Sequence, residues 1–374
     1  MVTVRHALGS YPVEVEPGAL SRLRSFAAGY VAGRRLALIT DSTVGPLFDA
    51  FRQGSGSWQA MPRVQPDVSE FAAELVVAAG EASKNRTQWT ALSDRLLDLA
   101  FGRDSAIVAL GGGMVGDLAG FVAATYLRGI PCVQVPTTLL AMLDASVGGK
   151  TGVDTPHGKN LIGAFHPPAA VLADPLVLRT LPEREYRAGL AEAVKHGLIA
   201  DAGYFAWLGA SADAIARRDE TTLATLVRRS VEIKAAVVGE DERENGRRAI
   251  LNAGHTVAHA VEHASDYALA HGEAVALGLV AECALAEAMG IGRRGLGAEV
   301  SALLGRLGLP VRLAHAVPRE RVMAAMATDK KNRAARVRFA LARDVGTMFP
   351  GEQWTVAAEE QAISAALDRL SRGV

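Results

Sequence analysis

Hydrophobic runs in the first half of the chain predict a β-sheet interleaved with helices. Residues 2–16 alternate between apolar and polar side chains around Gly9-Ser10, which predicts a β-hairpin. A helix is expected from about Thr87 to Ala100. Continuous apolar runs predict buried strands of the kind found in parallel sheets, at 35–40, 105–110, 132–135 and 170–173.

The second half of the chain has a helical pattern. From about Arg184 onward alanine, leucine, glutamate and arginine dominate, and apolar residues recur at helical spacing. A strand-like stretch at 337–341 interrupts this pattern. We therefore predict an α/β nucleotide-binding domain with a parallel sheet over residues 1–176, and an all-α domain over residues 177–374.

The composition excludes several classes of protein. The chain has 374 residues, 49% hydrophobic and 21% charged, which suffices for two globular domains. Forty basic residues balance forty acidic ones, so no net field draws the protein to nucleic acid or to a membrane. Any anion site must therefore be a local basic pocket.

The ends and the cysteines indicate a cytoplasmic protein. The first residues lack an apolar signal core, and no apolar run reaches the length of about 18 residues that a membrane helix needs. Cys132 and Cys283 form no metal or disulfide pattern, which fits a reducing compartment.

The stretch from Asn252 to Glu273 concentrates four of the nine histidines: His255, His259, His263 and His271. If residues 254–263 are helical, His255 and His259 lie one turn apart on one face. His271 stands where a second helix begins. Two imidazoles and a carboxylate from elsewhere form a common catalytic zinc set. The alternative is a helix with surface histidines.

The third ligand is expected at Glu192. It lies in a predicted helix, 189–196, among apolar neighbours, and a buried glutamate needs a partner or a metal. The alternative is a surface ion pair between Glu192 and Lys195, which are three residues apart.

A glycine-rich turn indicates a dinucleotide site. The predicted strand 105–110 leads into Gly111-Gly112-Gly113 and then into a helix that contains Asp117. Such a turn lets the backbone approach a pyrophosphate at a helix N-terminus. The spacing matches neither the Rossmann fingerprint nor a Walker loop, so a purely structural turn stays open. Asp41 ends another strand, where open α/β sheets bind ligands.

Basic and polar residues in the middle of the chain form a candidate anion cradle. Lys150 and the pair Lys159-Asn160 are expected in glycine-flanked loops at strand ends, near the hydroxyls of Thr137 and Thr138. Such lysines are usually solvated, but these lie among glycines rather than on an amphipathic helix. From spacing alone we assign no role to Arg248 or Lys331.

Taken together, these motifs resemble the 3-dehydroquinate synthase family of sugar phosphate cyclases. The resemblance covers nearly the whole chain, and its most specific stretches are Gly111–Asp117, Asp144–Lys150, Gly189–Lys195, and Leu251–His255 through His271–Glu273. It implies bound NAD, one divalent metal ion (zinc or cobalt) and a homodimer. It also implies a small-molecule substrate, 3-deoxy-D-arabino-heptulosonate 7-phosphate, converted to 3-dehydroquinate and phosphate in aromatic amino-acid synthesis.

The resemblance also assigns residues. It implies that Glu192, His255 and His271 bind the metal in the C-terminal domain. The positions that match the family's NAD contacts are Asp41, Glu81, Lys84, Gly112, Gly113, Met114, Asp117, Thr137, Thr138, Lys159, Thr180, Leu181 and Glu185. Those that match its substrate pocket are Arg128, Asp144, Lys150, Asn160, Lys195, Lys234, Arg248, Asn252, His259 and Lys331.

Within these sets, a catalytic role is implied for Lys150, Lys195, Arg248, Asn252, His259 and His271. Arg128 matches an arginine that reaches a neighbouring subunit's pocket in the family. The sequence departs from the family at Ala258 and Ala335, where glycine is usual; each adds a methyl group and removes no functional side chain.

Three other functions are compared with this one. A related cyclase of secondary metabolism, such as an aminodehydroquinate, 2-deoxy-scyllo-inosose or valiolone synthase, shares most motifs, but Lys234, Asn252 and Lys331 favour a substrate that carries a carboxylate. A metal-dependent alcohol dehydrogenase of the glycerol dehydrogenase type shares the architecture and lacks these phosphate-binding lysines. A non-catalytic NAD-binding scaffold would not need the full set of ligands.

Overall fold

The computed structural model describes residues 1–55, 58, 71–313, 317–328 and 337–372. The chain forms two compact units. The first contains Met1–Leu181 together with Leu223–Ala235, and the second contains Pro182–Thr222 together with Ala236–Val374. The functional domain boundary expected at residue 176 stays a prediction.

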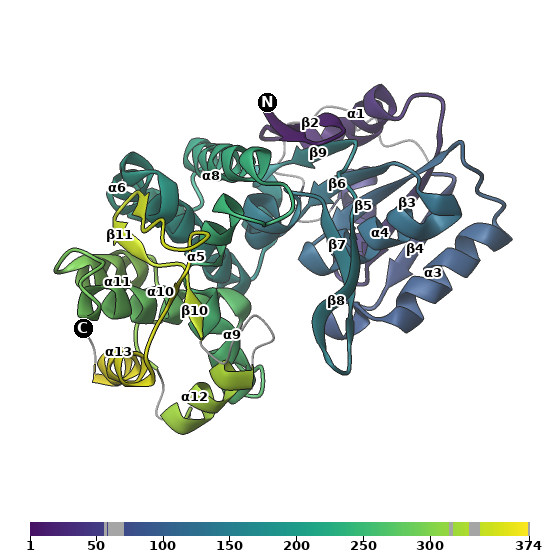
Figure 1. The fold of residues 1–374 in the computed structure, drawn as a ribbon. Coiled ribbons are helices and arrows are strands. Elements are labelled where there is room, and N and C mark those ends of the chain that lie inside the picture. Colours follow the sequence, from purple (N-terminus) through teal and green to yellow (C-terminus); the bar gives the residue numbers. More distant parts are fainter. Residues whose placement is uncertain (56–57, 59–70, 314–316, 329–336, 373–374) are drawn as a thin grey trace. The chain divides into compact units, whose positions relative to one another are not determined.

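A seven-stranded sheet organises the first unit, with the strand order β1-β2-β9-β6-β5-β3-β4 (Figure 1). All neighbouring strands are parallel except β1 and β2. The strands are β1 (Val2–His6), β2 (Gly9–Val15), β3 (Arg35–Asp41), β4 (Ala73–Val77), β5 (Ser105–Gly111), β6 (Cys132–Pro136) and β9 (Ala170–Ala173). The four strands expected from continuous apolar runs are confirmed as β3, β5, β6 and β9.

The first hairpin is confirmed, but its turn precedes Gly9 instead of lying at Gly9-Ser10. Residues 7 and 8 form the turn, and His6 pairs with Gly9, the first residue of β2. The edge strand β4 was not anticipated. Its short pattern, Ala-Glu-Leu-Val-Val, buries only two of its five side chains, so it lacks the continuous apolar signal of its neighbours.

The prediction of loops around Lys150 and Lys159-Asn160 is wrong. These residues belong to a second antiparallel hairpin, formed by β7 (Lys150–Thr155) and β8 (Gly158–Phe165). Two of the glycines that suggested loops, Gly152 and Gly163, face each other inside this hairpin. A Cβ atom on Gly152 would lie 2.8 Å from the carbonyl oxygen of Ile162, so glycine allows the two backbones to approach closely.

The helices of the first unit are α1 (Leu23–Tyr30), α2 (Val44–Arg52), α3 (Arg86–Asp98) and α4 (Gly113–Thr125). The helix expected at 87–100 is α3. Helix α4 packs tightly on the sheet, because a Cβ atom on Gly116 would lie 2.8 Å from the side-chain oxygen of Gln134 on β6. This close packing fixes the start of α4 directly after β5.

The second unit is helical, as predicted. Its helices are α5 (Glu183–Ala200), α6 (Ala202–Ala210), α7 (Ala212–Ala216), α9 (His255–Ala264), α10 (His271–Ala288), α11 (Leu296–Arg306), α12 (Arg319–Thr328) and α13 (Glu360–Arg372). Helix α8 (Glu220–Glu240) has its central residues in the first unit. Helix α10 contacts α5, α9, α11 and α13, and is therefore central to this unit.

Four short strands accompany these helices. They are β10 (Arg338–Phe339), β11 (Ala342–Asp344), β12 (Thr347–Met348) and β13 (Val356–Ala357). Strand β10 falls in the stretch whose sequence looked strand-like. Among the residues that the structure describes, no helix is both long enough and apolar enough to cross a membrane.

Candidate functional site

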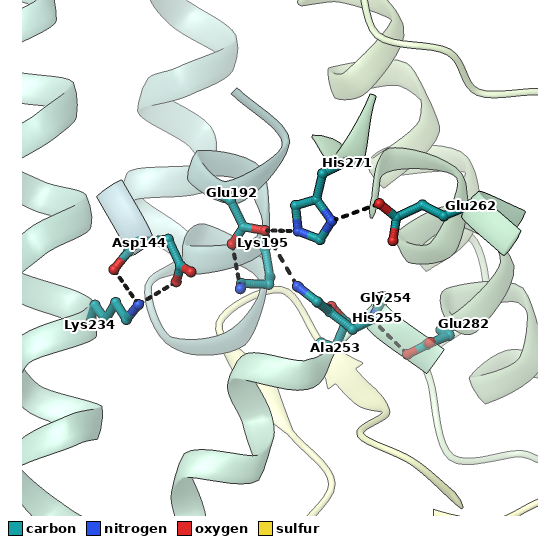
Figure 2. A network of polar contacts seen from close by, with 10 residues as sticks. All are labelled: Asp144, Glu192, Lys195, Lys234, Ala253, Gly254, His255, Glu262, His271 and Glu282. Carbon is teal, nitrogen blue, oxygen red and sulfur yellow. Dashed lines mark hydrogen bonds and ion pairs between the residues drawn. The ribbon is translucent and has the colours of Figure 1, made fainter. Parts of the chain in front are cut away.

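The expected metal ligands of the second unit converge. One donor atom from each of Glu192, His255 and His271 lies within 4.8 Å of the other two. The Nε2 atoms of His255 and His271 are 3.6 Å and 4.0 Å from the same carboxylate oxygen, Oε1 of Glu192 (Figure 2). Two imidazoles and a carboxylate at this spacing form a donor set typical of a catalytic zinc site.

Each donor stands on a different helix. Glu192 lies in α5 and is fully buried, while His255 and His271 are the first residues of α9 and α10. Gly254 precedes α9 with a φ of 81°, a conformation that glycine adopts without strain. The predicted placement of His255 and His259 on one helical face is confirmed, with ring centroids 5.6 Å apart.

The second nitrogen of each histidine ligand is also held. The Nδ1 atom of His255 lies 3.1 Å from the carbonyl oxygen of Ala253. The Nδ1 atom of His271 lies 3.4 Å from Oε1 of Glu262, which is buried on α9. If each Nδ1 carries the proton, each Nε2 presents a lone pair toward Glu192.

The surroundings of the two histidine ligands shift their pKa values in opposite directions. Burial lowers the pKa of His255 well below its ordinary value, with further lowering by Lys195 and the other two histidines. A neutral imidazole is the form that binds metal. Burial alone would lower the pKa of His271, but the hydrogen bond and charge of Glu262 together with the charge of Glu192 raise it.

Glu192 and Lys195 form an ion pair, but it is not the surface pair considered as the alternative. The exposed fractions of their side chains are 0% and 2%. Two charges are stable at this depth only when they are paired, and a buried pair that is broken costs about 3–5 kcal/mol. Lys195 thus holds the Glu192 carboxylate in place and compensates its charge.

In the first unit, the candidate nucleotide residues gather at the carboxyl ends of neighbouring strands. Gly112 and Gly113 follow β5 and begin α4, while Thr137 and Thr138 follow β6. The amide of Thr137 donates to the carbonyl of Gly111 at 2.9 Å, which ties the two strand ends together. Both turns therefore lie where parallel α/β sheets bind ligands.

Asp41 ends the adjacent strand β3 and already has backbone partners. Its Oδ1 atom accepts hydrogen bonds from the amides of Thr43 and Val44 at 2.8 Å and 2.9 Å. This carboxylate therefore caps the start of α2, a structural role in addition to the one expected from the sequence.

Lys84 is a buried lysine that lies among three carboxylates. Its Nζ atom is 2.6 Å from Glu81, 3.3 Å from Asp117 and 3.8 Å from Asp154, and its side chain is only 5% exposed. Burial raises the pKa of Asp117 to about 6, although the charge and hydrogen bond of Lys84 act in the opposite direction. One ammonium group thus serves three carboxylates.

Comparison with known proteins identifies the chain. The family models described as 3-dehydroquinate synthase N-terminal and C-terminal match residues 74–188 and 189–332, which is more than half of the chain. The chain belongs to the 3-dehydroquinate synthase family. A 3-dehydroquinate synthase of Xanthomonas oryzae pv. oryzae is 46% identical over 342 residues, covering 90% of this chain and 90% of the relative.

Solved structures support the same fold. The 2-epi-5-epi-valiolone synthase of Streptomyces hygroscopicus subsp. jinggangensis, with NAD⁺ and Zn²⁺ bound, is 29% identical with a TM-score of 0.82, covering 99% of this chain and 98% of that one. A 2-deoxy-scyllo-inosose synthase in complex with carbaglucose-6-phosphate, NAD⁺ and Co²⁺ has a TM-score of 0.81 at 24% identity, covering 98% of each chain. Both share the fold of this chain.

The family's substrate positions in the second unit have definite partners. The Arg248 side chain is buried and donates to the carbonyl of Glu242, while its amide donates to Asp241 at 3.0 Å. The Nδ2 atom of Asn252 donates to Glu244 at 2.6 Å. His259 is exposed, with its ring centroid 6.4 Å from that of His271.

The family's substrate positions in the first unit differ in exposure. Lys234 is buried, and its Nζ atom donates to both the backbone carbonyl and the carboxylate of Asp144 at 2.5 Å. Lys150 and Asn160 are exposed on the β7–β8 hairpin. Arg128 is exposed too, with a φ of 70° that is unusual for a residue other than glycine.

The remaining expected NAD positions are more scattered. Met114 is half-buried in the first turn of α4, and Lys159 is exposed on β8. Thr180 accepts a hydrogen bond from Trp58 at 2.8 Å and Leu181 follows it, while Glu185 is exposed on α5 in the second unit. Lys331 lies outside the described residues.

Three carboxylates near these sites were missed from the sequence: the half-buried Asp154 and the buried Glu262 and Glu282. Glu262 and Glu282 are 4% and 3% exposed. The sequence did offer a signal for these two glutamates, because each lies among apolar residues on a helix, as Glu192 does. Asp154 carries no such signal, because only the pairing of Asn85 with β7 brings it to Lys84.

Proposed function

We propose that this chain is a 3-dehydroquinate synthase that uses NAD and one divalent metal ion, zinc or cobalt. Its substrate is 3-deoxy-D-arabino-heptulosonate 7-phosphate, and its products are 3-dehydroquinate and phosphate. The observation that carries this proposal is the convergence of Glu192, His255 and His271 within 4.8 Å, in a chain that is 46% identical to a 3-dehydroquinate synthase.

The donor set fits the metal. Zinc and cobalt both accept two imidazole nitrogens and a carboxylate oxygen, and three protein ligands leave a coordination position for the substrate. Glu192, His255 and His271 would hold the ion in the second unit. Lys195 would hold the Glu192 carboxylate in place, and the Ala253 carbonyl would keep the Nε2 atom of His255 available.

The two cofactors supply distinct chemistry. When bound, the metal would supply polarisation of the oxygen of the substrate's secondary alcohol, and NAD would supply reversible hydride transfer. The net reaction is therefore that of a lyase, with phosphate as the leaving group and ring closure by an intramolecular aldol step.

The chain's own residues bind and orient the substrate. Lys150, Asn160, Lys195, Arg248 and Lys331 are assigned to its phosphate and carboxylate, which they position rather than attack. The proton that is lost before phosphate leaves is assigned to an oxygen of that phosphate. His259 and His271 are the side chains assigned to other proton transfers, His271 only if it can shift from the metal.

The NAD site is assigned to the strand ends of the first unit. The start of α4 at Gly112 and Gly113 offers free amide groups to the pyrophosphate, aided by the helix dipole. Lys84, Glu81 and Asp117 line this region with polar groups, because the buried Lys84 ammonium pairs with both carboxylates. Thr137 and Thr138 complete this edge of the sheet.

A homodimer and a cytoplasmic location belong to the same proposal. The exposed position of Arg128 and its left-handed backbone support a residue that reaches out of its own subunit toward a neighbouring pocket. The family relationship supports both the dimer and the location.

The test is an assay of the metal-loaded protein with the heptulosonate phosphate and NAD. Phosphate and dehydroquinate should appear in equal amounts while NADH stays far below the amount of product. Accumulation of NADH with turnover would instead identify an alcohol dehydrogenase. Turnover of only the amino-substituted substrate would identify an aminodehydroquinate synthase.

A further inference from the structure

Helices α9 and α10 hold each other's ends. Each helix begins with one proposed metal ligand, His255 on α9 and His271 on α10. Each also carries a buried glutamate further along, Glu262 on α9 and Glu282 on α10. Each glutamate contacts the start of the other helix (Figure 2).

Glu262 contacts the ligand of the other helix. It lies about two turns beyond His255 on α9, and its Oε1 atom is 3.4 Å from Nδ1 of His271. This contact orients the imidazole so that its Nε2 atom faces Glu192. A carboxylate behind a ligating imidazole also makes that imidazole a stronger donor.

Glu282, on α10, supports the start of α9. It lies about three turns along α10, and its two carboxylate oxygens accept from the amides of Gly254 at 2.7 Å and Val257 at 3.3 Å. These amides belong to the start of α9, whose first N–H groups have no partners within the helix. Gly254 has no side chain to cap them, so Glu282 caps α9 from the neighbouring helix.

We propose that Glu262 and Glu282 are paired positioning residues of the metal site. Glu262 orients the imidazole of His271, and Glu282 fixes the first turn of α9, from which His255 projects. Each helix thus supplies one ligand and the support for the other ligand. This inference rests on the proposed function, because it takes Glu192, His255 and His271 as the ligands.

Close packing of the two helices makes the arrangement rigid. A Cβ atom on Gly278 of α10 would collide with the carbonyl oxygen of Gly254, and one on Gly254 would lie 2.9 Å from Leu279. The backbones therefore touch where α9 begins, and neither helix can slide without displacing a ligand of the other.

The experiment is a chelator-buffered titration of the metal-free full chain with Co²⁺, followed by its visible absorption. Glu262→Ala and Glu282→Gln should each weaken Co²⁺ binding by about 10–100-fold and change the position or intensity of the bands, which report coordination geometry. Glu262→Gln should recover part of the affinity, since an amide oxygen can still accept from Nδ1. At position 282 glutamine should already weaken binding, because its amide N–H would face a backbone N–H.

The matched control is Glu287→Gln, on the same helix α10. Glu287 accepts the amide of Gly297 at 2.7 Å and so supports the start of α11, away from the ligands. Its replacement should leave Co²⁺ affinity and absorption unchanged. This separates positioning of the metal ligands from general support of a helix end.

Two outcomes have different meanings. Wild-type affinity and absorption in Glu262→Ala and Glu282→Gln would overturn the positioning role while leaving the metal site intact. Unchanged Co²⁺ binding in His255→Ala would instead overturn the metal site of the proposed function. Folding is checked by circular dichroism of the metal-free chains. If a variant fails this check, aspartate is tested at the same position instead. Its shorter side chain moves the carboxylate away from its partner and should weaken binding in the same way.

Discussion

The Nε2 atom of His255 on α9 lies 3.6 Å from Oε1 of Glu192 on α5. Donor atoms that share one zinc ion at bonds of about 2.0–2.2 Å in a tetrahedral arrangement lie about 3.3 Å apart. The observed spacing is therefore close to that of a formed site. His271 completes the set at 4.0 Å from the same oxygen.

Loss of His255 should abolish both metal binding and turnover. His255→Ala removes one of three protein ligands, and no substitute donor remains at its Nε2 position. After loading with zinc and dialysis to remove unbound metal, the wild type should hold about one equivalent of zinc and His255→Ala almost none, as measured by elemental analysis. His263→Ala is the control, because His263 is exposed on the same helix. Full turnover by metal-depleted His255→Ala would contradict the role of His255.

The raised pKa of Asp117 should make the stability of the protein depend on pH. Since the pKa is about 6 when folded and 3.8 when unfolded, the folded state binds more protons between these values. The stabilisation associated with the protonated carboxyl is thus present at low pH and is lost as the pH rises through about 6.

Asp117→Asn tests this dependence without NAD. Raising the pH from about 5 to about 7.5 should lower the free energy of unfolding of the wild type by about 1 kcal/mol more than that of the variant. Urea denaturation at both pH values measures the difference. Parallel pH profiles for the two proteins would show that Asp117 has an ordinary pKa.

Loss of Lys84 should destabilise the first unit even without NAD. Lys84→Met would leave Glu81, Asp117 and Asp154 around an apolar side chain. These carboxylates are 45%, 19% and 20% exposed, so water compensates part of the loss, and we expect a cost of about 1–2 kcal/mol rather than that of breaking a fully buried pair. Lys159→Met should leave stability within about 0.5 kcal/mol, because Lys159 is exposed. Both variants should bind NAD more weakly, so equal stability of the two would refute the structural role of Lys84.

Close contact between α9 and α10 predicts a severe effect of one methyl group. Gly278→Ala would force the two backbones apart where α9 begins, lowering the free energy of unfolding by about 3 kcal/mol and weakening metal binding. Gly209→Ala on α6 would meet only Leu303 at 3.7 Å, an ordinary contact. That control should be neutral or stabilising by up to about 1 kcal/mol, because alanine favours helices. A thermal melt of Gly278→Ala that matched the wild type would contradict the tight packing.

Much of the fold could be predicted from local pattern. The strands β3, β5, β6 and β9 are continuous apolar runs, because parallel strands are buried on both faces. The helical second unit was predicted from apolar residues that recur at helical spacing. The hairpin β7–β8 escaped prediction because its glycines signal turns, whereas here they serve close approach of two backbones.

The candidate site could be predicted only where functional residue types cluster along the chain or stand out among apolar neighbours. The histidine stretch suggested His255 and His271, and an acid among apolar residues suggested Glu192. Glu282 could not be assigned to α9 by the same means, because its partners are backbone amides of another helix. A hydrogen bond to main chain leaves no trace in the sequence of the donor.

The most direct test of the metal site is a crystal structure of the zinc-loaded protein with anomalous data at the zinc edge. One anomalous peak should lie about 2.0–2.2 Å from Nε2 of His255, Nε2 of His271 and a carboxylate oxygen of Glu192. A zinc peak coordinated by other side chains, with these three atoms unligated, would contradict it.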